Sequence, residues 1–158
     1  MTIIVPLVYD GNGEIEQLQS GDSLSTTSQL PQYTNGSGGA ITIGSPVYIS
    51  SNDTVQLAQA NASGTVGVIG LVAQTSIPSS SVGSVQVEGV LTATTAQWDA
   101  IVGGSTGLTA GAKYYLSPTT AGLLTTTPTT TIGQYVIRVG RAISTTEMKI
   151  DIGCQILL

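Results

Sequence analysis

The side chains that could carry out chemistry in this chain are few, and histidine is not among them. The 158 residues include nine carboxylates, one cysteine and no histidine. Histidine is the commonest general base and the commonest metal ligand, so a nucleophile or a metal ion would lack its usual partner here. We therefore expect no enzymatic activity, and no bound cofactor or metal.

One serine lies in a sequence pattern typical of hydrolases. Residues 103–107 (GGSTG) match G-x-S-x-G, with Ser105 at the position of the nucleophile. That pattern works as a sharp turn from a strand into a helix, with a histidine as base. Here the pattern follows an expected helix and no histidine exists, so a flexible loop is the better interpretation.

The acidic residues near the N-terminus resemble the start of a calcium loop. Asp10-Gly-Asn-Gly-Glu14 would need glycine at the sixth position and glutamate at the twelfth, but these are Ile15 and Gly21. The glycines and asparagine instead predict a hairpin turn. Glu14 and Glu16 alternate with Ile15, which is typical of the wet face of a strand rather than a pair of catalytic carboxylates.

Charge is sparse and unevenly distributed along the chain. Only 8% of residues are charged and the net charge is −5. All four basic residues fall in the last third of the chain: Lys113, Arg138, Arg141 and Lys149. The sequence shows no basic stripe and no long apolar or basic amphipathic helix, so neither a nucleic acid nor a membrane is expected as a partner.

The apolar residues predict a core of small aliphatic side chains. They make up 41% of the chain, with no phenylalanine and one tryptophan. Such a core buries little area per residue, so we expect oligomerisation to contribute to stability. Cys154 lies in an apolar run, which predicts a buried free thiol.

The first part of the chain is expected to be an extended arm, residues 1–33, followed by a Gly/Ser linker at residues 34–39 (TNGSGG). Pro6 disfavours a helix in the arm. The apolar residues of the arm are its candidate anchoring residues: Ile3, Ile4, Val5, Leu7, Val8, Ile15 and Leu18.

The rest of the chain, residues 40–158, predicts a small β-barrel or sandwich built from a duplicated β module. The copies span about residues 40–93 and 107–158. Each has a tyrosine-containing strand (44–50 and 111–117), a strand around a glycine (66–73 and 136–143) and an alternating strand (85–91 and 150–156). Glycines at matching strand positions predict bulges or bends.

One short helix is expected to join the two copies. Thr94 or Thr95 could cap residues 96–102, and the glycines at 103 and 104 would end the helix. Trp98 in this helix is expected to pack on the neighbouring sheet. The alternative is an exposed tryptophan that stacks on a sugar.

Two stretches resemble structural proteins of tailed-bacteriophage virions. Residues 6–24 (PLVYDGNGEIEQLQSGDSL) resemble the opening segment of head-decoration and fibre proteins. Residues 94–101, 107–117 and 136–144 are similar to virion proteins of the same kind. The resemblance covers about half of the chain and implies a β-rich fold, a homotrimer and attachment to a shell.

The favoured hypothesis is a capsid decoration protein on the outer surface of the virion. Its arm would lie along the major capsid protein, and its β domain would face outward. The alternative is a tail-fibre or receptor-binding component that binds carbohydrate on the host surface. The short chain without a heptad stalk favours the head.

Overall fold

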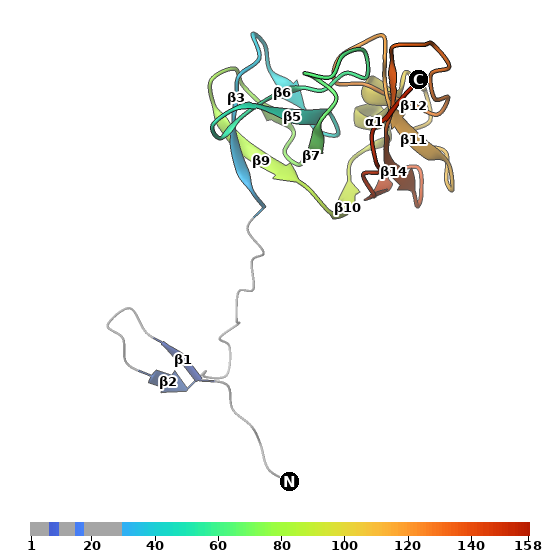
Figure 1. The fold of residues 1–158 in the computed structure, drawn as a ribbon. Helices are drawn as coiled ribbons and strands as arrows, with labels where there is room; N and C mark the ends of the chain where they lie inside the picture. The colour runs from blue at the N-terminus through green and yellow to red at the C-terminus, as the bar shows by residue number, and fades with distance from the viewer. Residues whose placement is uncertain (1–6, 10–14, 18–29) are drawn as a thin grey trace.

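The computed structural model describes residues 7–9, 15–17 and 30–158. Within them the chain forms sixteen strands and one helix, which confirms the mainly-β prediction. The strands of residues 32–86 gather in one half of the body and those of the second half lie beside them, with β10 running between the two (Figure 1).

The described part of the arm is a two-stranded hairpin. β1 (Leu7–Tyr9) pairs antiparallel with β2 (Ile15–Gln17), with Tyr9 opposite Ile15. The pairing brackets the predicted turn. Of the candidate anchoring residues, three lie in these strands: Leu7, Val8 and Ile15. The other four fall outside the described residues: Ile3, Ile4, Val5 and Leu18.

The first module is a closed five-stranded barrel. Its strands follow the order β3 (Gln32–Asn35), β6 (Thr54–Leu57), β5 (Pro46–Ser51), β7 (Val68–Val72) and β9 (Val82–Gln86). The β3–β6 pair is parallel and closes the barrel, and the other pairs are antiparallel. β4 (Ile41–Thr42) and β8 (Ser76–Ile77) pair beside it. Small aliphatic side chains make up this module's own core: Ile41, Val47, Val55, Val72, Ile77 and Val85.

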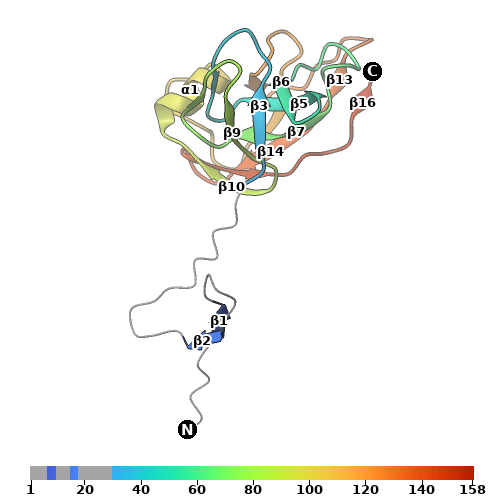
Figure 2. The same ribbon diagram turned by 90° about the vertical axis from the view of Figure 1, so that its left-hand side faces the viewer.

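The second module is an open five-stranded sheet. Its order is β10 (Gly89–Thr92), β15 (Glu147–Ile150), β14 (Arg138–Ala142), β11 (Lys113–Leu116) and β12 (Leu124–Thr125). The helix α1 (Thr95–Val102) follows β10 and contacts β12. β13 (Tyr135–Val136) and β16 (Ile156–Leu157) form a separate pair near the C-terminus (Figure 2).

The two modules repeat the same strand order and the same register. In the first, Val47 pairs with Gly70 and the register then shifts, so that Tyr48 pairs with Val68. In the second, Tyr114 pairs with Gly140, and after the same shift Tyr115 pairs with Arg138. The predicted glycine bulges are therefore present at matching positions. β3 and β10 are the first strands of the two modules, and β9 and β15 are the last.

Two features of the predicted organisation are wrong, for one shared reason. The prediction overlooked the first strand of each module. Residues 34–39 do not form a linker, because Thr34 and Asn35 belong to β3 of the barrel. Residues 85–91 are not one strand, because β9 ends at Gln86 and β10 of the next sheet begins at Gly89, whose φ is +85°. The helix thus lies inside the second module and not between the copies.

The prediction for the last strand is also wrong. It placed the strand at residues 150–156, whereas β15 ends at Ile150. The chain then follows β14 through single hydrogen bonds, from Asp151 N to Val139 O and from Gly153 N to Arg138 O. Apolar alternation continues past the end of the sheet and cannot show where pairing stops.

Asn35 explains why the glycine-rich segment is ordered. Its side chain is fully buried and forms hydrogen bonds with backbone groups of the turn that follows β3. The amide nitrogen donates to Gly39 O at 2.9 Å and Ile77 O at 2.7 Å, while Oδ1 accepts from Ser37 N at 2.8 Å. Gly36 N still donates to Val55 O at 2.9 Å, and hydrogen bonds of one buried amide hold the residues that follow.

The predicted helix is confirmed, with both of its caps. Thr94 accepts from Gln97 N and Gln97 accepts from Thr94 N, a capping box, and Gly103 ends the helix in the left-handed region. Trp98 is fully buried, as expected, and its Nε1 donates to Thr146 O at 2.9 Å. Gly44 of the first module lies directly against the Trp98 ring. Trp98 therefore belongs to a core shared by both modules.

Replacing Asn35 by alanine is expected to destabilise the body by about 2–3 kcal/mol, because the buried carbonyl of Ile77 loses its donor. The measurement is the midpoint of thermal unfolding, with Asn52→Ala, an exposed site, as the matched control. Equal midpoints for the two variants would show that the segment after β3 does not depend on this amide.

Gly140→Ala is expected to cost about 2 kcal/mol, because a Cβ there would lie 2.5 Å from Lys149 O and force the strands apart. Gly64→Ala is the control, since a Cβ at Gly64 meets no atom within 4 Å. Chemical denaturation of both variants measures the difference. An unchanged unfolding free energy for Gly140→Ala would contradict the close approach of β14 and β15.

Candidate interaction surface

The four basic residues, scattered over 37 positions of sequence, meet on one face of the second module. Lys113 pairs with Arg141, and Arg141 pairs with Lys149, across three adjacent strands. Register partners in an antiparallel sheet lie about 5 Å apart. The three cations therefore form a row about 10 Å long, which we call the basic row. The sequence-based conclusion that no basic stripe exists is wrong, because strand pairing makes neighbours of residues distant in sequence.

The bulge in β14 brings Arg138 to the same face. Arg138 and Arg141 are three residues apart, so a regular strand would point them to opposite faces. The register shift opposite Tyr115 adds one residue and restores the alternation. Both arginines then line one groove of about 370 Å³, together with Lys113, Lys149 and Asp151.

One carboxylate lies in this groove. Asp151 Oδ2 is 2.8 Å from an Nη atom of Arg138, and both side chains are partly exposed. Among the described residues, this is the one ion pair within 4 Å. Lys113, Arg141 and Lys149 are all exposed to solvent. Like charges directly opposite one another in a sheet repel, so the basic row lowers the stability of the isolated body.

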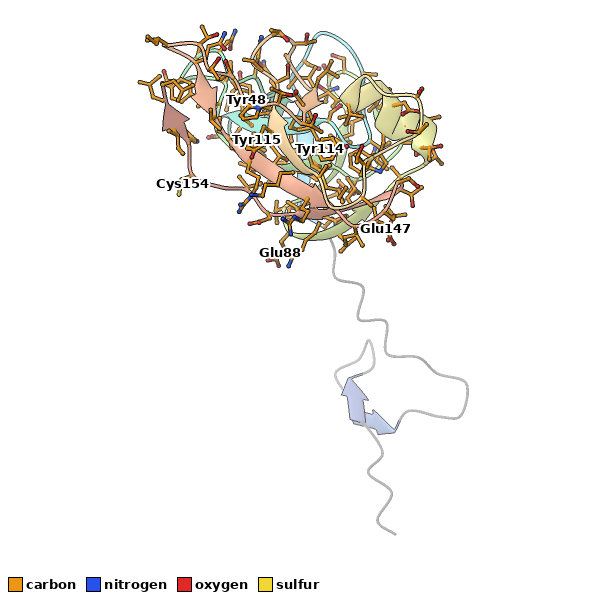
Figure 3. All side chains as sticks on the ribbon, turned by 90° about the vertical axis from the view of Figure 1, so that its right-hand side faces the viewer. Tyr48, Glu88, Tyr114, Tyr115, Glu147 and Cys154 are labelled. Carbon is orange, nitrogen blue, oxygen red and sulfur yellow. The ribbon has the colours of Figure 1, made fainter. Side chains whose placement is uncertain are left out.

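An apolar depression continues the groove toward the C-terminus. It is lined by Tyr115, Val136, Arg138, Gly153, Cys154 and Ile156. Figure 3 shows Tyr115 on this side of the body, with Cys154 toward one end and Glu147 toward the other. Cys154 is exposed, so the predicted buried thiol is wrong. The reason is the early end of β15, which leaves residues 153–155 outside the core.

Exposed aliphatic side chains accompany this surface. Val90, the register partner of Lys149 on β10, is 44% exposed. At the other end Ile156 and Leu157 are 56% and 59% exposed, on the β16 strand. Ile132 is 89% exposed. It lies close to the C-terminus, because the next residue, Gly133, donates its N–H to Leu158 O. An apolar margin beside a charged groove is typical of a protein interface.

The same face of the first module is already covered. By register, Val68 and Leu71 occupy the positions of Arg138 and Arg141. Both valine and leucine are buried in the core that the two modules share. In the first module this face is therefore an internal interface. In the second module the same face carries cations and is exposed to solvent.

The residues singled out as possible chemistry do not form a site. Ser105 lies in an exposed loop. The loop is tied to the helix by a hydrogen bond of 2.7 Å from Gly107 N to Asp99 Oδ1. Glu16 lies in β2, while Asp10 and Glu14 fall outside the described residues. In the part of the chain that the structure covers, no three His, Cys, Asp or Glu side chains cluster as metal ligands.

The sugar-stacking alternative for Trp98 is wrong, because its ring has no exposed surface. No signal in the sequence pointed to the basic row as a site. The one available hint was that all four cations follow residue 112.

Comparison with protein-family models gives no match, and no curated protein is significantly similar to the chain. Among the described residues, no helix is both long and apolar enough to cross a membrane. The function is therefore inferred from the surface and the fold.

The single tryptophan allows its burial to be tested directly. We expect Trp98 fluorescence to be blue-shifted in the native protein and poorly quenched by acrylamide, since the indole ring is enclosed and its Nε1 is hydrogen-bonded. Titration with oligosaccharides should leave the spectrum unchanged. Efficient quenching, or a saturable change with a sugar, would contradict the burial of the ring.

Proposed function

We propose that this chain is a structural protein of a tailed-phage virion that decorates the outer surface of the capsid as a homotrimer. Residues 1–29 would anchor it to the major capsid protein, and the two-module body would face outward. The protein would act by binding and stabilising the shell, not by catalysis.

The observation that carries the proposal is that residues 30–158 form a body with two apolar cores of its own. Among residues 30–158, the members of the two apolar cores and the residues packed on them lie between Tyr33 and Ile152. All buried side-chain nitrogen and oxygen atoms of the described residues also have partners. Because residues 30–158 supply these cores and satisfy their buried polar atoms, we assign residues 1–29 to a partner.

The composition of the N-terminal segment supports a docking role. It combines an apolar run, residues 3–8, with a hairpin whose strands are only three residues long. An isolated two-stranded hairpin is marginally stable in water. Contact with a groove or strand edge of a larger particle would supply the missing stabilisation.

The surface of the body supports assembly in the same way. Its exposed groove joins four cations to an apolar depression, and the adjacent margin carries exposed aliphatic side chains. Repeated over a closed lattice, individually weak contacts of this kind give high total affinity. Attachment at many sites would stabilise a shell against internal pressure.

Deletion of residues 1–29 is expected to abolish binding to capsids while the body stays folded. Full-length and truncated protein would be mixed with capsids that lack the protein and sedimented together. Circular dichroism and the unfolding midpoint would verify the truncated fold. Undiminished co-sedimentation of residues 30–158 would rule out the anchoring role of the arm.

Point variants distinguish the loss of the apolar anchoring side chains from the effect of shortening the chain. Replacing Ile3, Ile4 and Val5 by serine should weaken co-sedimentation, because the apolar run is removed. The matched control is the triple exchange of Ser20, Ser23 and Ser25 to alanine in the same segment. Immunogold labelling of intact virions locates the protein, and labelling of the tail instead of the head would favour the fibre alternative.

A further inference from the structure

The basic row is a set of like charges, and within residues 30–158 none of its three members forms an ion pair within 4 Å. Lys113, Arg141 and Lys149 are direct register partners, and all three are exposed. Repulsion within such a row costs stability, which an anionic group placed across the strands would recover. The geometry therefore favours an occupant that carries several negative charges in an extended arrangement.

The chain itself contains a segment of this chemistry. Residues 1–29 hold four carboxylates and no cation: Asp10, Glu14, Glu16 and Asp22. The body, residues 30–158, holds the other five carboxylates and all four cations. The net charge of −5 thus divides into −4 for the segment and −1 for the body. The segment and the groove are the most oppositely charged parts of the protein.

The spacing of the acids suits the basic row. Glu14 and Glu16 are two residues apart in sequence, which corresponds to about 6.8 Å along an extended strand. The basic row spans about 10 Å from Lys113 to Lys149. An extended segment crossing the row could place two carboxylates among the three cations at once, with charge-assisted hydrogen bonds to each.

The surroundings of the groove indicate that the segment comes from another molecule. Exposed Val90, Ile156 and Leu157 flank the groove at both ends. A short acidic segment cannot cover these side chains, whereas a neighbouring subunit could. The equivalent face of the first module, at Val68 and Leu71, is covered by another module in the same way.

We propose that the basic row binds the acidic segment of residues 10–22 from a second copy of this chain, linking subunits arm to body. The interaction is electrostatic and reciprocal around the oligomer. It leaves the apolar residues 3–8 available to a shell. It does not depend on the capsid, so it is measured with purified protein in solution.

The test uses two full-length charge-reversal variants. Arg141→Glu with Lys149→Glu gives a chain whose arm and groove are both acidic. Glu14→Lys with Glu16→Lys keeps the basic groove and changes the charge of the arm from −4 to zero, with two cations at the centre of the segment. Each variant alone should lose the oligomer that the wild type forms at low salt. Their equimolar mixture should associate again, because the unaltered acidic arm of the first variant meets the unaltered basic groove of the second.

Sedimentation velocity gives the mass of each species, and circular dichroism confirms that each variant is folded. Ser51→Glu with Asn52→Glu, two exposed positions on the far hairpin of the barrel, is the control for added negative charge and should remain oligomeric. Wild-type association should weaken by at least tenfold between 50 mM and 500 mM salt, because exposed charges are screened.

Three results would overturn the proposal. The first is a wild-type chain that is monomeric at low salt. The second is an oligomer that survives either reversal, which would assign assembly to the apolar margin. The third is a mixture of the variants that stays monomeric, which would show that the arm and the groove of different subunits do not bind each other through their charges. Loss of capsid binding by the arm deletion would still stand in each case.

Discussion

The close approach of two strands at a glycine underlies the shape of both modules. At Gly140 the backbone of β15 lies so near that a side chain would meet Lys149 O. Gly70 makes the same approach to Gln86 O in the first module. Beside each glycine the register shifts by one residue, which bends the strand and changes which side chains face outward. In the second module this bulge places Arg138 on the same face as the basic row.

The unusual composition of the chain follows from the size of the barrel. A five-stranded barrel has a narrow interior, since barrel diameter grows with strand number. Val47, Val55 and Val72 fill it, and a phenylalanine would not be accommodated without strain. The larger side chains, Trp98 and Tyr114, lie in the shared core where the open sheet and α1 leave more room. In the second module α1 contacts β12. The equivalent strand of the first module, β6, instead pairs with β3 and closes the barrel.

Charge distinguishes the two copies of one architecture. The outward face near the bulge carries Val68 and Leu71 in the first module, and these pack against the second module. The corresponding positions in the second module carry Arg138 and Arg141 and remain exposed or partly exposed. The same face is thus buried in the first module and exposed in the second.

Local signals in the sequence were sufficient for the elements that local interactions stabilise. The capping box of Thr94 and Gln97 and the glycine at 103 fixed the helix, and the paired glycines predicted the bulges. The strand order was partly readable, because the second and fourth strands of each module, β5 with β7 and β11 with β14, repeat in the sequence. The first strands were not, because β3 ends in a glycine-rich turn ordered by Asn35 through contacts with Ile77, 42 residues away.

The candidate surface was decided by tertiary structure alone. Lys113, Arg141 and Lys149 are separated by many residues, and only antiparallel register makes them neighbours. The exposure of Cys154 likewise depended on where β15 stops pairing, which apolar alternation does not reveal. The sequence by itself determined the β class, the duplication and the charge content. Which of those charges meet, and on which face, followed from long-range strand pairing and one extra residue in a strand.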